Sequence, residues 1–426
     1  MSIYYIYIFI SPILLLILYI SSFFNFKIKN NLFFYKSILN NHKEKIKLNT
    51  KPVLLFHAAS AGEFEQLKPV LKRIDRDKYF IIQSFTSSTI YDKSNVWKSY
   101  VDIGCYQPFD ILFRASKYFF NFIKPKCYII TRHDIWPKYI VEAKKQGIPI
   151  IIINANIHKN SLWNKQLLKS FSLFIFNKID HFLVPSERIK NNLTKISNCL
   201  NVSIISDTRF AQIIDRTLKN KNIQLPELTI LLDSSNIIFG SIDENDEKII
   251  FKGLKATYPN GEKDLLEQKQ KLIFVPHEIH PKIITRLCNQ VESLGMKATL
   301  YNSKQKKQSI SEANVIIIVE VGILAELYRY SQLAYIGGGF SRGVHSVIEP
   351  GIYNNLIACG PNIEMLDEAK EMLSHNLLTQ IDNVQDLSNF FALLNNKNQS
   401  NKSSKAFILQ KQSSINKIIN LIDETV

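Results

Sequence analysis

The chain has 426 residues, a length typical of two or three domains, and its 46% hydrophobic and 21% charged residues exclude wholesale disorder. Five cysteines lie far apart without a CxxC pair, which argues against a disulfide framework or a zinc cluster and fits a reducing compartment. The excess of 53 Lys and Arg over 37 Asp and Glu gives a net charge of +16, which indicates an anionic partner such as nucleic acid, an acidic membrane surface or a phosphorylated substrate.

The N-terminal residues 1–26 predict a membrane anchor. No charged side chain occurs from Ser2 to Phe26, and about 20 apolar residues in a helix suffice to cross a hydrocarbon core of roughly 30 Å. Residues 27–51 form a basic juxtamembrane segment in which Glu44 is the single acid, and such flanking charge stays on the cytoplasmic side. Two alternatives stay open: a buried globular helix, and a segment kinked at Pro12 that lies in the membrane interface without crossing.

From residue 52 the sequence alternates short apolar runs with stretches of helical spacing, which predicts parallel sheets covered by helices on both faces. We expect two α/β domains, at 52–206 and 236–400, joined by a linker at 207–235 and followed by a C-terminal helix at 401–426. Because ligands in such folds bind beyond the carboxyl ends of the strands, we expect the site in the cleft between the domains. The expected strands are PVLLFHA, YFIIQSFT, CYIITR, IPIIIINA and HFLVPS in the first domain, and IIFGSI, KLIFVP, MKATLY, NVIIIV, LAYIGG and LIACG in the second.

The first candidate site is the segment HAASAGEFE, residues 57–65, between the first strand and the first helix. Gly62 and the small residues around it let the backbone turn tightly. Glu63 falls at the N-terminus of the helix, where the dipole favours negative charge. A carboxylate exposed at the mouth of a cleft is a candidate general base. The alternative is that Glu63 or Glu65 only caps the helix.

The second candidate site is the glycine-rich segment GGGFSRGVHSVIEP, residues 337–350, which leads from a strand into a helix. Free backbone N–H groups in such a loop can hold phosphate. Because the segment is neither GxxxxGK[ST] nor GxGxxG, the P-loop and dinucleotide-binding interpretations fail. Glu349 in the following helix could accept hydrogen bonds from ribose hydroxyls, and the alternative is a tight turn without a ligand.

Two other polar segments at strand ends have simpler explanations. His277 and His280 lie close together, but no further ligand follows at a metal-binding spacing, so we expect no metal. The segment from Arg132 to Pro137 predicts the start of a helix, because proline fits the first helical turn.

In their order along the chain, these segments resemble the Kdo transferases, which move 3-deoxy-D-manno-octulosonic acid (Kdo) from CMP-Kdo onto the lipid A precursor. The resemblance implies a GT-B glycosyltransferase fold with two Rossmann-like domains and an interdomain cleft, the acceptor on the first domain and the nucleotide sugar on the second. It also implies transfer without a metal or other cofactor. The resemblance covers nearly the whole chain and rests on HAASAGEFEQLKPVL, the IWP turn, IPIIIINAN, the turn at Ser241, VPHEIHP, GILAELY and GGGFSRGVHSVIEP.

The resemblance further implies roles for individual residues. Glu63 matches the catalytic base of the family's S-x-G-E motif. The sequence departs from the family at His277 and Ser346, which replace an arginine and an asparagine, and at Thr131–Asp134, which replaces an acidic E-T-E segment. The implied donor-binding residues are Pro276, His277, Gly322, Ile323, Leu324, Ser346, Val347, Ile348 and Glu349.

We therefore expect transfer of Kdo from CMP-Kdo to the lipid A precursor, lipid IVA, in lipopolysaccharide biosynthesis, by an inverting displacement with Glu63 as general base. The expected partners are CMP-Kdo, the lipid acceptor and the anionic surface of the inner membrane, with the catalytic domains in the cytoplasm. Nucleic acid is not expected, because the lysines are dispersed over loops. The alternative is another membrane-associated GT-B glycosyltransferase with a UDP-sugar donor, which would share the glycine-rich loop and Glu349.

Overall fold

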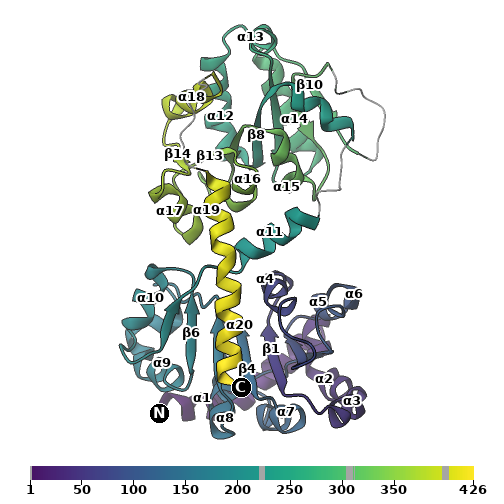
Figure 1. Cartoon of the computed structure of the whole chain (residues 1–426), viewed down its shortest axis with the longest axis vertical. Helices are drawn as coiled ribbons and strands as arrows, with labels where there is room; N and C mark the ends of the chain where they lie inside the picture. The colour runs from purple at the N-terminus through teal and green to yellow at the C-terminus, as the bar shows by residue number, and fades with distance from the viewer. Residues whose placement is uncertain (1, 220–225, 304–309, 311, 396–402) are drawn as a thin grey trace. The chain divides into compact units, whose positions relative to one another are not determined.

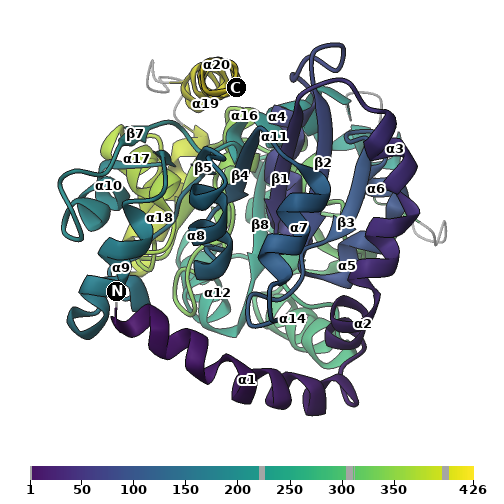
Figure 2. The ribbon, with the colours of Figure 1, turned by 90° about the horizontal axis from the view of Figure 1, so that it is seen from below.

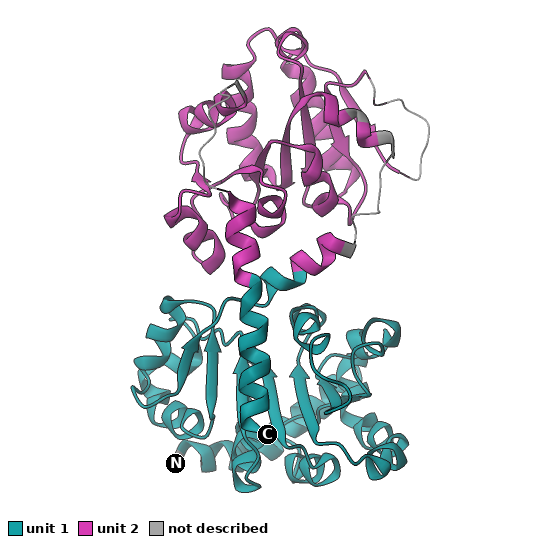
Figure 3. Ribbon diagram, viewed as in Figure 1, with its two compact units in different colours: residues 1–212, 412–426 teal, residues 213–411 magenta. Residues whose placement is uncertain are grey.

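Two parallel sheets of seven strands each organise the chain (Figure 1). The structure, a computed structural model, describes residues 2–219, 226–303, 310, 312–395 and 403–426. Unit 1 comprises Met1–Gln212 and Gln412–Val426, and unit 2 comprises Ile213–Lys411 (Figure 3). Residues 220–225 of the expected linker and residues 401–402 of the expected C-terminal helix lie outside the described residues.

The sheet of unit 1 has the strand order β3-β2-β1-β4-β5-β6-β7, and every neighbouring pair is parallel. Its five strands β1 to β5 are buried along their whole length, which explains their almost continuous apolar sequences. The strands are β1 (Val53–Ala58), β2 (Phe80–Phe85), β3 (Ile103–Tyr106), β4 (Cys127–Thr131), β5 (Ile150–Ile153), β6 (His181–Val184) and β7 (Val202–Ile204).

Helices cover both faces of this sheet. One hydrophobic cluster joins the sheet to α2, α7, α8 and α9, and a second joins it to α4 and the C-terminal helix α20. The helices of unit 1 are α1 (Ser2–Ser22), α2 (Phe26–Asn41), α3 (Lys43–Leu48), α4 (Ala61–Leu71), α5 (Ser88–Tyr91), α6 (Ser94–Trp97), α7 (Ala115–Ile123), α8 (Pro137–Lys145), α9 (Lys169–Phe176), α10 (Glu187–Thr194) and α20 (Ser414–Thr425), with 3₁₀ turns at Leu162–Asn164 and Gln166–Leu168.

The sheet of unit 2 repeats this architecture with the order β10-β11-β9-β8-β12-β13-β14, again with parallel neighbours. Between Gly240 and Ile242 the register of β8 against β9 shifts at a bulge, and Ser241 there has a positive φ of 58°. The strands are β8 (Ser235–Ile242), β9 (Gln270–Pro276), β10 (Ala298–Tyr301), β11 (Val315–Ile318), β12 (Leu333–Ile336), β13 (Leu356–Cys359) and β14 (Thr379–Gln380).

Helices also pack on both faces of the second sheet. The boundary between the units falls within α11 (Arg209–Lys219). The helices of unit 2 are α12 (Glu244–Thr257), α13 (Glu262–Glu267), α14 (Pro281–Ser293), α15 (Leu324–Leu327), α16 (Ile348–Ile352), α17 (Asp367–Ser374), α18 (Val384–Ala392) and α19 (Ser404–Gln410), with 3₁₀ segments at Pro226–Asp233, Tyr328–Tyr330, Leu393–Asn395 and Lys411–Ser413.

The predicted α/β fold class is confirmed, and each of the apolar runs expected to be a strand contains one. Three strands were not expected: β3, β7 and β14. Each lies at or next to a sheet edge, and β7 and β14 have only three and two residues. Segments as short as β7 and β14 carry too little periodicity to be recognised from the sequence, and the apolar run of β3, IGCY, is interrupted by Gly104.

The N-terminal apolar run forms α1. Among the described residues, Ile3–Ser22 is long and apolar enough to cross a membrane by length and composition. The basic segment that follows is helical, and α2 contributes Tyr35 and Leu39 to the hydrophobic core of unit 1.

Candidate active site

The junction of β1 and α4 in unit 1 fixes the carboxylate of Glu63. Ser60 is the N-cap of α4, and its side chain accepts a hydrogen bond of 3.3 Å from the backbone N–H of Glu63. In return, Oε2 of Glu63 accepts bonds from the backbone N–H groups of Ala59, at 2.6 Å, and Ser60, at 3.2 Å. This reciprocal arrangement is a capping box. The helix-capping alternative for Glu63 is therefore present in the structure.

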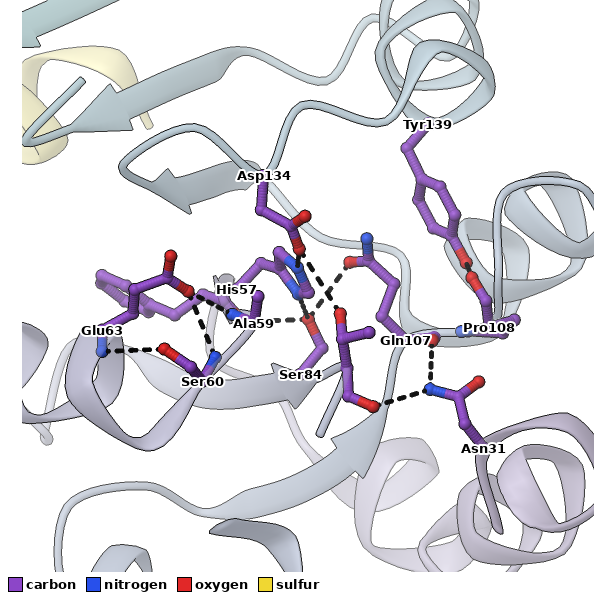
Figure 4. A network of polar contacts seen from close by, with 12 residues as sticks. Asn31, His57, Ala59, Ser60, Glu63, Ser84, Gln107, Pro108, Asp134 and Tyr139 are labelled. Atoms are coloured by element: carbon purple, nitrogen blue, oxygen red, sulfur yellow. Dashed lines mark hydrogen bonds and ion pairs between the residues drawn. The ribbon is translucent and has the colours of Figure 1, made fainter. Parts of the chain in front are cut away.

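The second carboxylate oxygen of Glu63 has a different environment. Oε1 accepts no hydrogen bond from the part of the chain that the structure describes, whereas Oε2 accepts two. The side chain is nevertheless largely buried, with a relative exposure of 6%. Figure 4 shows the carboxylate with one oxygen turned toward the backbone of Ala59 and Ser60 and the other turned away from it. Capping thus orients the group and leaves one oxygen for another partner.

A buried histidine lies at the end of the same strand (Figure 4). His57 is fully buried, and its ring nitrogens are 2.6 Å from Oδ2 of Asp134 and 2.9 Å from Oγ of Ser84. Burial alone would raise the pKa of the Asp134 carboxyl, but the hydrogen bond and charge of His57 outweigh it, and the pKa is lowered. A network of charged and polar groups therefore surrounds the carboxyl ends of β1 and β4.

The sequence did not reveal this contact. In the sequence, His57 belongs to the segment HAASAGEFE and Asp134 to a predicted helix start, and neither segment indicates the other. The sequence feature that could have indicated a shared site is that both residues lie at the ends of apolar runs. Their contact, however, requires that β1 and β4 are neighbours in the sheet, where His57 lies opposite Ile130. Neither apolar sequence specifies which strand will be its neighbour in the sheet.

In unit 2, a pocket of about 400 Å³ opens beyond the carboxyl ends of β8, β9 and β12. Two histidine rings stack in its lining: the ring centroids of His277 and His345 are 4.6 Å apart, at an interplanar angle of 21°. Nδ1 of His277 also lies 2.9 Å from Oγ of Ser241. Burial and the charge of His277 lower the pKa of His345. Charged side chains of both signs also line the pocket, namely Asp243, Glu244, Glu278, Arg286 and Arg342.

The glycine-rich loop is bonded mainly within unit 2. A Cβ at Gly338, whose φ is +87°, would come within 2.5 Å of the backbone oxygen of Gly343, so this position requires glycine. Six backbone N–H groups within residues 337–345 already donate hydrogen bonds inside the unit, so these six are not free to bind phosphate. The engaged N–H groups belong to Gly337, Gly338, Ser341, Gly343, Val344 and His345.

Glu349 has a partner that the sequence did not suggest. Its Oε1 accepts a bond of 2.5 Å from Nη2 of Arg216 on α11. Burial would lower the pKa of Arg216, but the charge and hydrogen bond of Glu349 raise it. Both side chains are partly exposed, at 36% for Arg216 and 20% for Glu349, so the pair remains within reach of solvent.

The other predicted donor-binding residues divide by location. Gly322, Ile323 and Leu324 stand at the start of α15, and Ser346 precedes α16. Val347 and Ile348 are buried apolar residues, at 0% and 1% exposure. Among the nine predicted residues, His277 lines the pocket of unit 2 in which His277 and His345 stack, which we call the histidine pocket. Pro276 is buried at the end of β9.

Comparison with known proteins gives the following relationships. Residues 27–212 match the family model of the 3-deoxy-D-manno-octulosonic-acid transferases (kdotransferases). The 3-deoxy-D-manno-octulosonic acid transferase of Aquifex aeolicus is 28% identical over 340 residues, which are 78% of this chain and 82% of that protein. The transferase of the same description from Chlamydophila psittaci is 26% identical over 76% of this chain and 73% of that protein.

Solved structures share the fold at low sequence identity. The UDP-GlcNAc 2-epimerase of Neisseria meningitidis superposes with a TM-score of 0.59 at 14% identity, over 88% of this chain and 99% of that chain. A glycosyltransferase from Rickettsia africae gives a TM-score of 0.56 at 12% identity, over 88% of this chain and 96% of that chain. At these identities the likeness concerns the two-sheet architecture alone.

Proposed function

We propose that the chain, which resembles the Kdo transferases over residues 27–212 and is 28% and 26% identical to two of them, transfers Kdo from CMP-Kdo to the lipid A precursor, with Glu63 as the general base. In this proposal unit 1 binds the lipid acceptor and unit 2 binds CMP-Kdo. The relatives from Aquifex aeolicus and Chlamydophila psittaci, both described as 3-deoxy-D-manno-octulosonic acid transferases, support Kdo as the transferred sugar.

The environment of Glu63 is the observation that carries the proposal. A sugar hydroxyl is a poor nucleophile at neutral pH, so a positioned base must accept its proton as the new bond forms. Two backbone N–H groups hold Oε2 of Glu63, while Oε1 accepts no bond within the described chain. A carboxylate that is fixed through one oxygen can accept a proton at the other without losing its orientation.

The proposed reaction is a single displacement. The acceptor hydroxyl loses its proton to Oε1 of Glu63, and its oxygen forms a bond to the anomeric carbon of Kdo. The bond from that carbon to the phosphate oxygen of CMP breaks, and its electron pair leaves with CMP. One displacement of this kind inverts the anomeric centre.

On the donor side, we assign the phosphate to side chains, because six N–H groups of the glycine-rich loop are already bonded. His277, His345 and Arg342 line one pocket and can supply positive charge to an anion there. We assign Glu349 its predicted role as an acceptor for ribose hydroxyls, and its carboxylate also accepts a hydrogen bond from Arg216.

We further propose that the protein acts at the cytoplasmic face of the inner membrane. The apolar helix α1 and the excess of 16 positive charges support this location, because a phosphorylated lipid acceptor and anionic lipid attract basic side chains.

A donor panel tests the proposal. The full-length protein is incubated in detergent with lipid IVA and either CMP-Kdo or a UDP-sugar, and nucleotide release is followed. We expect acceptor-dependent release of CMP from CMP-Kdo and no release of UDP. Release of UDP alone would overturn the proposal in favour of a GT-B enzyme with a UDP-sugar donor.

A further inference from the structure

The helix α1 is amphipathic in the opposite sense to a helix on the surface of a water-soluble protein. Its inward side chains recur every three or four residues and include four that carry hydroxyl groups: Tyr4, Tyr7, Ser11 and Ser22. The opposite side, which we call the outer face of α1, consists of apolar side chains that are 53–81% exposed, with Tyr5, at 58%, along its edge. This outer face consists of Ile6, Phe9, Ile13, Leu16, Ile17 and Ile20.

Such an arrangement indicates that the outer face meets lipid. A helix that packs on a protein in water normally buries its apolar stripe and exposes its polar side. Here the polar side is the one that packs on unit 1, and the hydroxyl of Tyr7 donates a bond of 2.7 Å to Oδ2 of the buried Asp110.

Contacts with unit 1 extend along most of α1. Near its start, the rings of Tyr4 and Phe174 of α9 have centroids 5.5 Å apart. Near its end, the rings of Tyr19 and Phe33 of α2 have centroids 5.9 Å apart. From Tyr4 to Tyr19 the helix covers about 22 Å at 1.5 Å per residue. Figure 2 shows α1 along one side of unit 1, between α9 near its start and α2 near its end.

These contacts conflict with a helix that crosses the bilayer. The hydrocarbon core is roughly 30 Å thick, so a spanning α1 would carry the segments of unit 1 that touch it into hydrocarbon. Among them is Asp110, which is 1% exposed and also accepts bonds from the backbone N–H groups of Lys138 and Tyr139. Burying that polar neighbourhood in lipid would be unfavourable.

The segments that contact α1 also carry exposed apolar and basic side chains of the kind that bind an anionic bilayer. Phe33 and Phe34 of α2 are each 49% exposed, and Leu167 beside α9 is 87% exposed. Apolar side chains at the headgroup boundary and lysines in the headgroup layer are the features of helices that lie on membranes. The exposed lysines of these segments are Lys27, Lys29 and Lys36 in α2, and Lys165 and Lys169 next to or within α9.

We infer that α1 lies in the plane of the membrane, with its outer face among the acyl chains near the headgroups and its hydroxyl-bearing side on unit 1. The partner is a lipid surface with anionic headgroups. This inference deepens the proposed function, because the lipid acceptor would then approach unit 1 at the membrane surface that α1 occupies. It concerns a segment that the family model does not cover, since that match begins at residue 27.

The hydrogen-bond network around His57 in unit 1 is connected to α2, the helix that follows α1. Asn31 is fully buried, and its side-chain amide donates to the backbone oxygens of Gln107, at 3.0 Å, and Thr86, at 3.2 Å. The side-chain Oε1 of Gln107 in turn accepts from Ser84, which contacts His57. Membrane contact at α1 and α2 would therefore set the orientation of the proposed acceptor unit relative to the lipid.

Depth measurements along the outer face of α1 test the inference. Ile6, Ile13 and Ile20 are spaced by seven residues and are 53%, 59% and 53% exposed, so they share one face. Each is changed to cysteine in full-length protein with Cys199→Ser and Cys288→Ser, and labelled with a fluorophore. Quenching by lipids that carry quenchers at different depths is measured in vesicles of phosphatidylethanolamine and phosphatidylglycerol. An in-plane helix predicts the same shallow depth at all three positions.

Two results would overturn the inference. A label at position 13 that is clearly deeper than those at positions 6 and 20 would indicate a spanning helix. No association of the protein with the vesicles would exclude a membrane role for α1 altogether. CMP release in detergent is measured in parallel, because it reports the proposed transfer activity whatever the outcome with vesicles.

A charge substitution gives an independent measurement. Ile13→Asp should reduce vesicle binding about tenfold or more, because an acidic side chain in an apolar membrane segment is strongly unfavourable. Leu266→Asp is the matched control, since Leu266 is 60% exposed on α13 in unit 2. Equal binding of both variants would contradict the inference, and circular dichroism checks that both are folded.

Discussion

The polar residues at the carboxyl ends of the strands are bonded very differently in the two units. In unit 1, both ring nitrogens of the buried His57 have partners, and the capping box fixes Glu63. In unit 2, His277 is exposed, bonds to Ser241 and stacks on His345. The first arrangement holds its side chains by hydrogen bonds within the unit and leaves Oε1 of Glu63 for another partner, whereas the second gathers histidines and charged side chains of both signs around an open pocket. We interpret the difference as a preorganised base on one unit and an anion-binding surface on the other.

The largest effect is expected at the preorganised group. Glu63→Gln should lower turnover about 10²–10⁴-fold, because glutamine cannot accept the acceptor proton. Donor affinity and thermal stability should change little, since glutamine at this position also completes a capping box. Steady-state rates of CMP release and a thermal melt measure both properties.

Glu65→Gln is the matched control for this substitution. Glu65 lies two residues further along α4 and pairs with Lys68 at the surface. A normal rate for Glu63→Gln, or an equal loss of rate in both variants, would leave capping as the only role of Glu63.

The buried network of unit 1 predicts a pH-dependent stability. Asp134→Asn should lower the free energy of unfolding at neutral pH by about 1.5–3 kcal/mol, the usual worth of a hydrogen bond to a charged group. The folded-state pKa of Asp134 is lowered from 3.8, so its stabilising contribution is present above that value and disappears as pH falls through the folded pKa. Denaturant unfolding between pH 3 and 7 should show the two proteins converging at low pH. A difference in the free energy of unfolding that stays constant with pH would mean that the charge of Asp134 does not contribute to stability.

On the donor side, the Glu349 carboxylate should contribute to nucleotide binding. Glu349→Ala should weaken CMP binding by about 1–3 kcal/mol in isothermal titration, because the ribose hydroxyls would lose their acceptor. Arg216→Met is the control, since it removes the partner of Glu349 and keeps the carboxylate. Unchanged affinity in Glu349→Ala, or a larger loss in Arg216→Met, would move the ribose contact elsewhere.

The histidine pocket predicts a smaller effect of pH on donor affinity. If a donor anion binds to the protonated imidazole of His345, whose pKa is lowered from 6.5, donor affinity should fall as pH rises above that lowered pKa, by up to about tenfold per pH unit for one linked proton. Because the pKa of His345 is lowered in the free protein, donor binding should be accompanied by proton uptake. Titration calorimetry in buffers of different ionisation enthalpy measures that uptake. Flat affinity together with a harmless His277→Ala would assign the phosphate to Arg342 instead.

Much of the fold could be predicted because buried parallel strands leave continuous apolar runs such as Ile150–Ile153. The short edge strand β7 could not, since its residues are half-buried or exposed and show no distinct period. The sequence also located α1 but left its relation to the membrane open. Its two faces became apparent only from contacts with Asp110, Phe174 and Phe33, which are distant in the chain.

The candidate site was predictable where a motif is local. Glu63 follows Ser60 by three residues, so the capping geometry is already present in the sequence. The contacts His57–Asp134, His277–His345 and Arg216–Glu349 join segments that are 68 or more residues apart. Such pairs depend on strand order and on loop conformation, and no pattern within either segment specifies its partner.

The product formed by the full-length protein tests the central claim most directly. CMP-Kdo and lipid IVA are incubated with the wild-type protein, and the lipid is analysed by mass spectrometry and for the configuration of the new glycosidic bond. The account predicts a lipid with added Kdo, in inverted configuration relative to the donor, and one CMP released for each Kdo transferred. Retained configuration would contradict the single displacement with Glu63 as base, and an unmodified lipid in the presence of folded protein would contradict Kdo transfer itself.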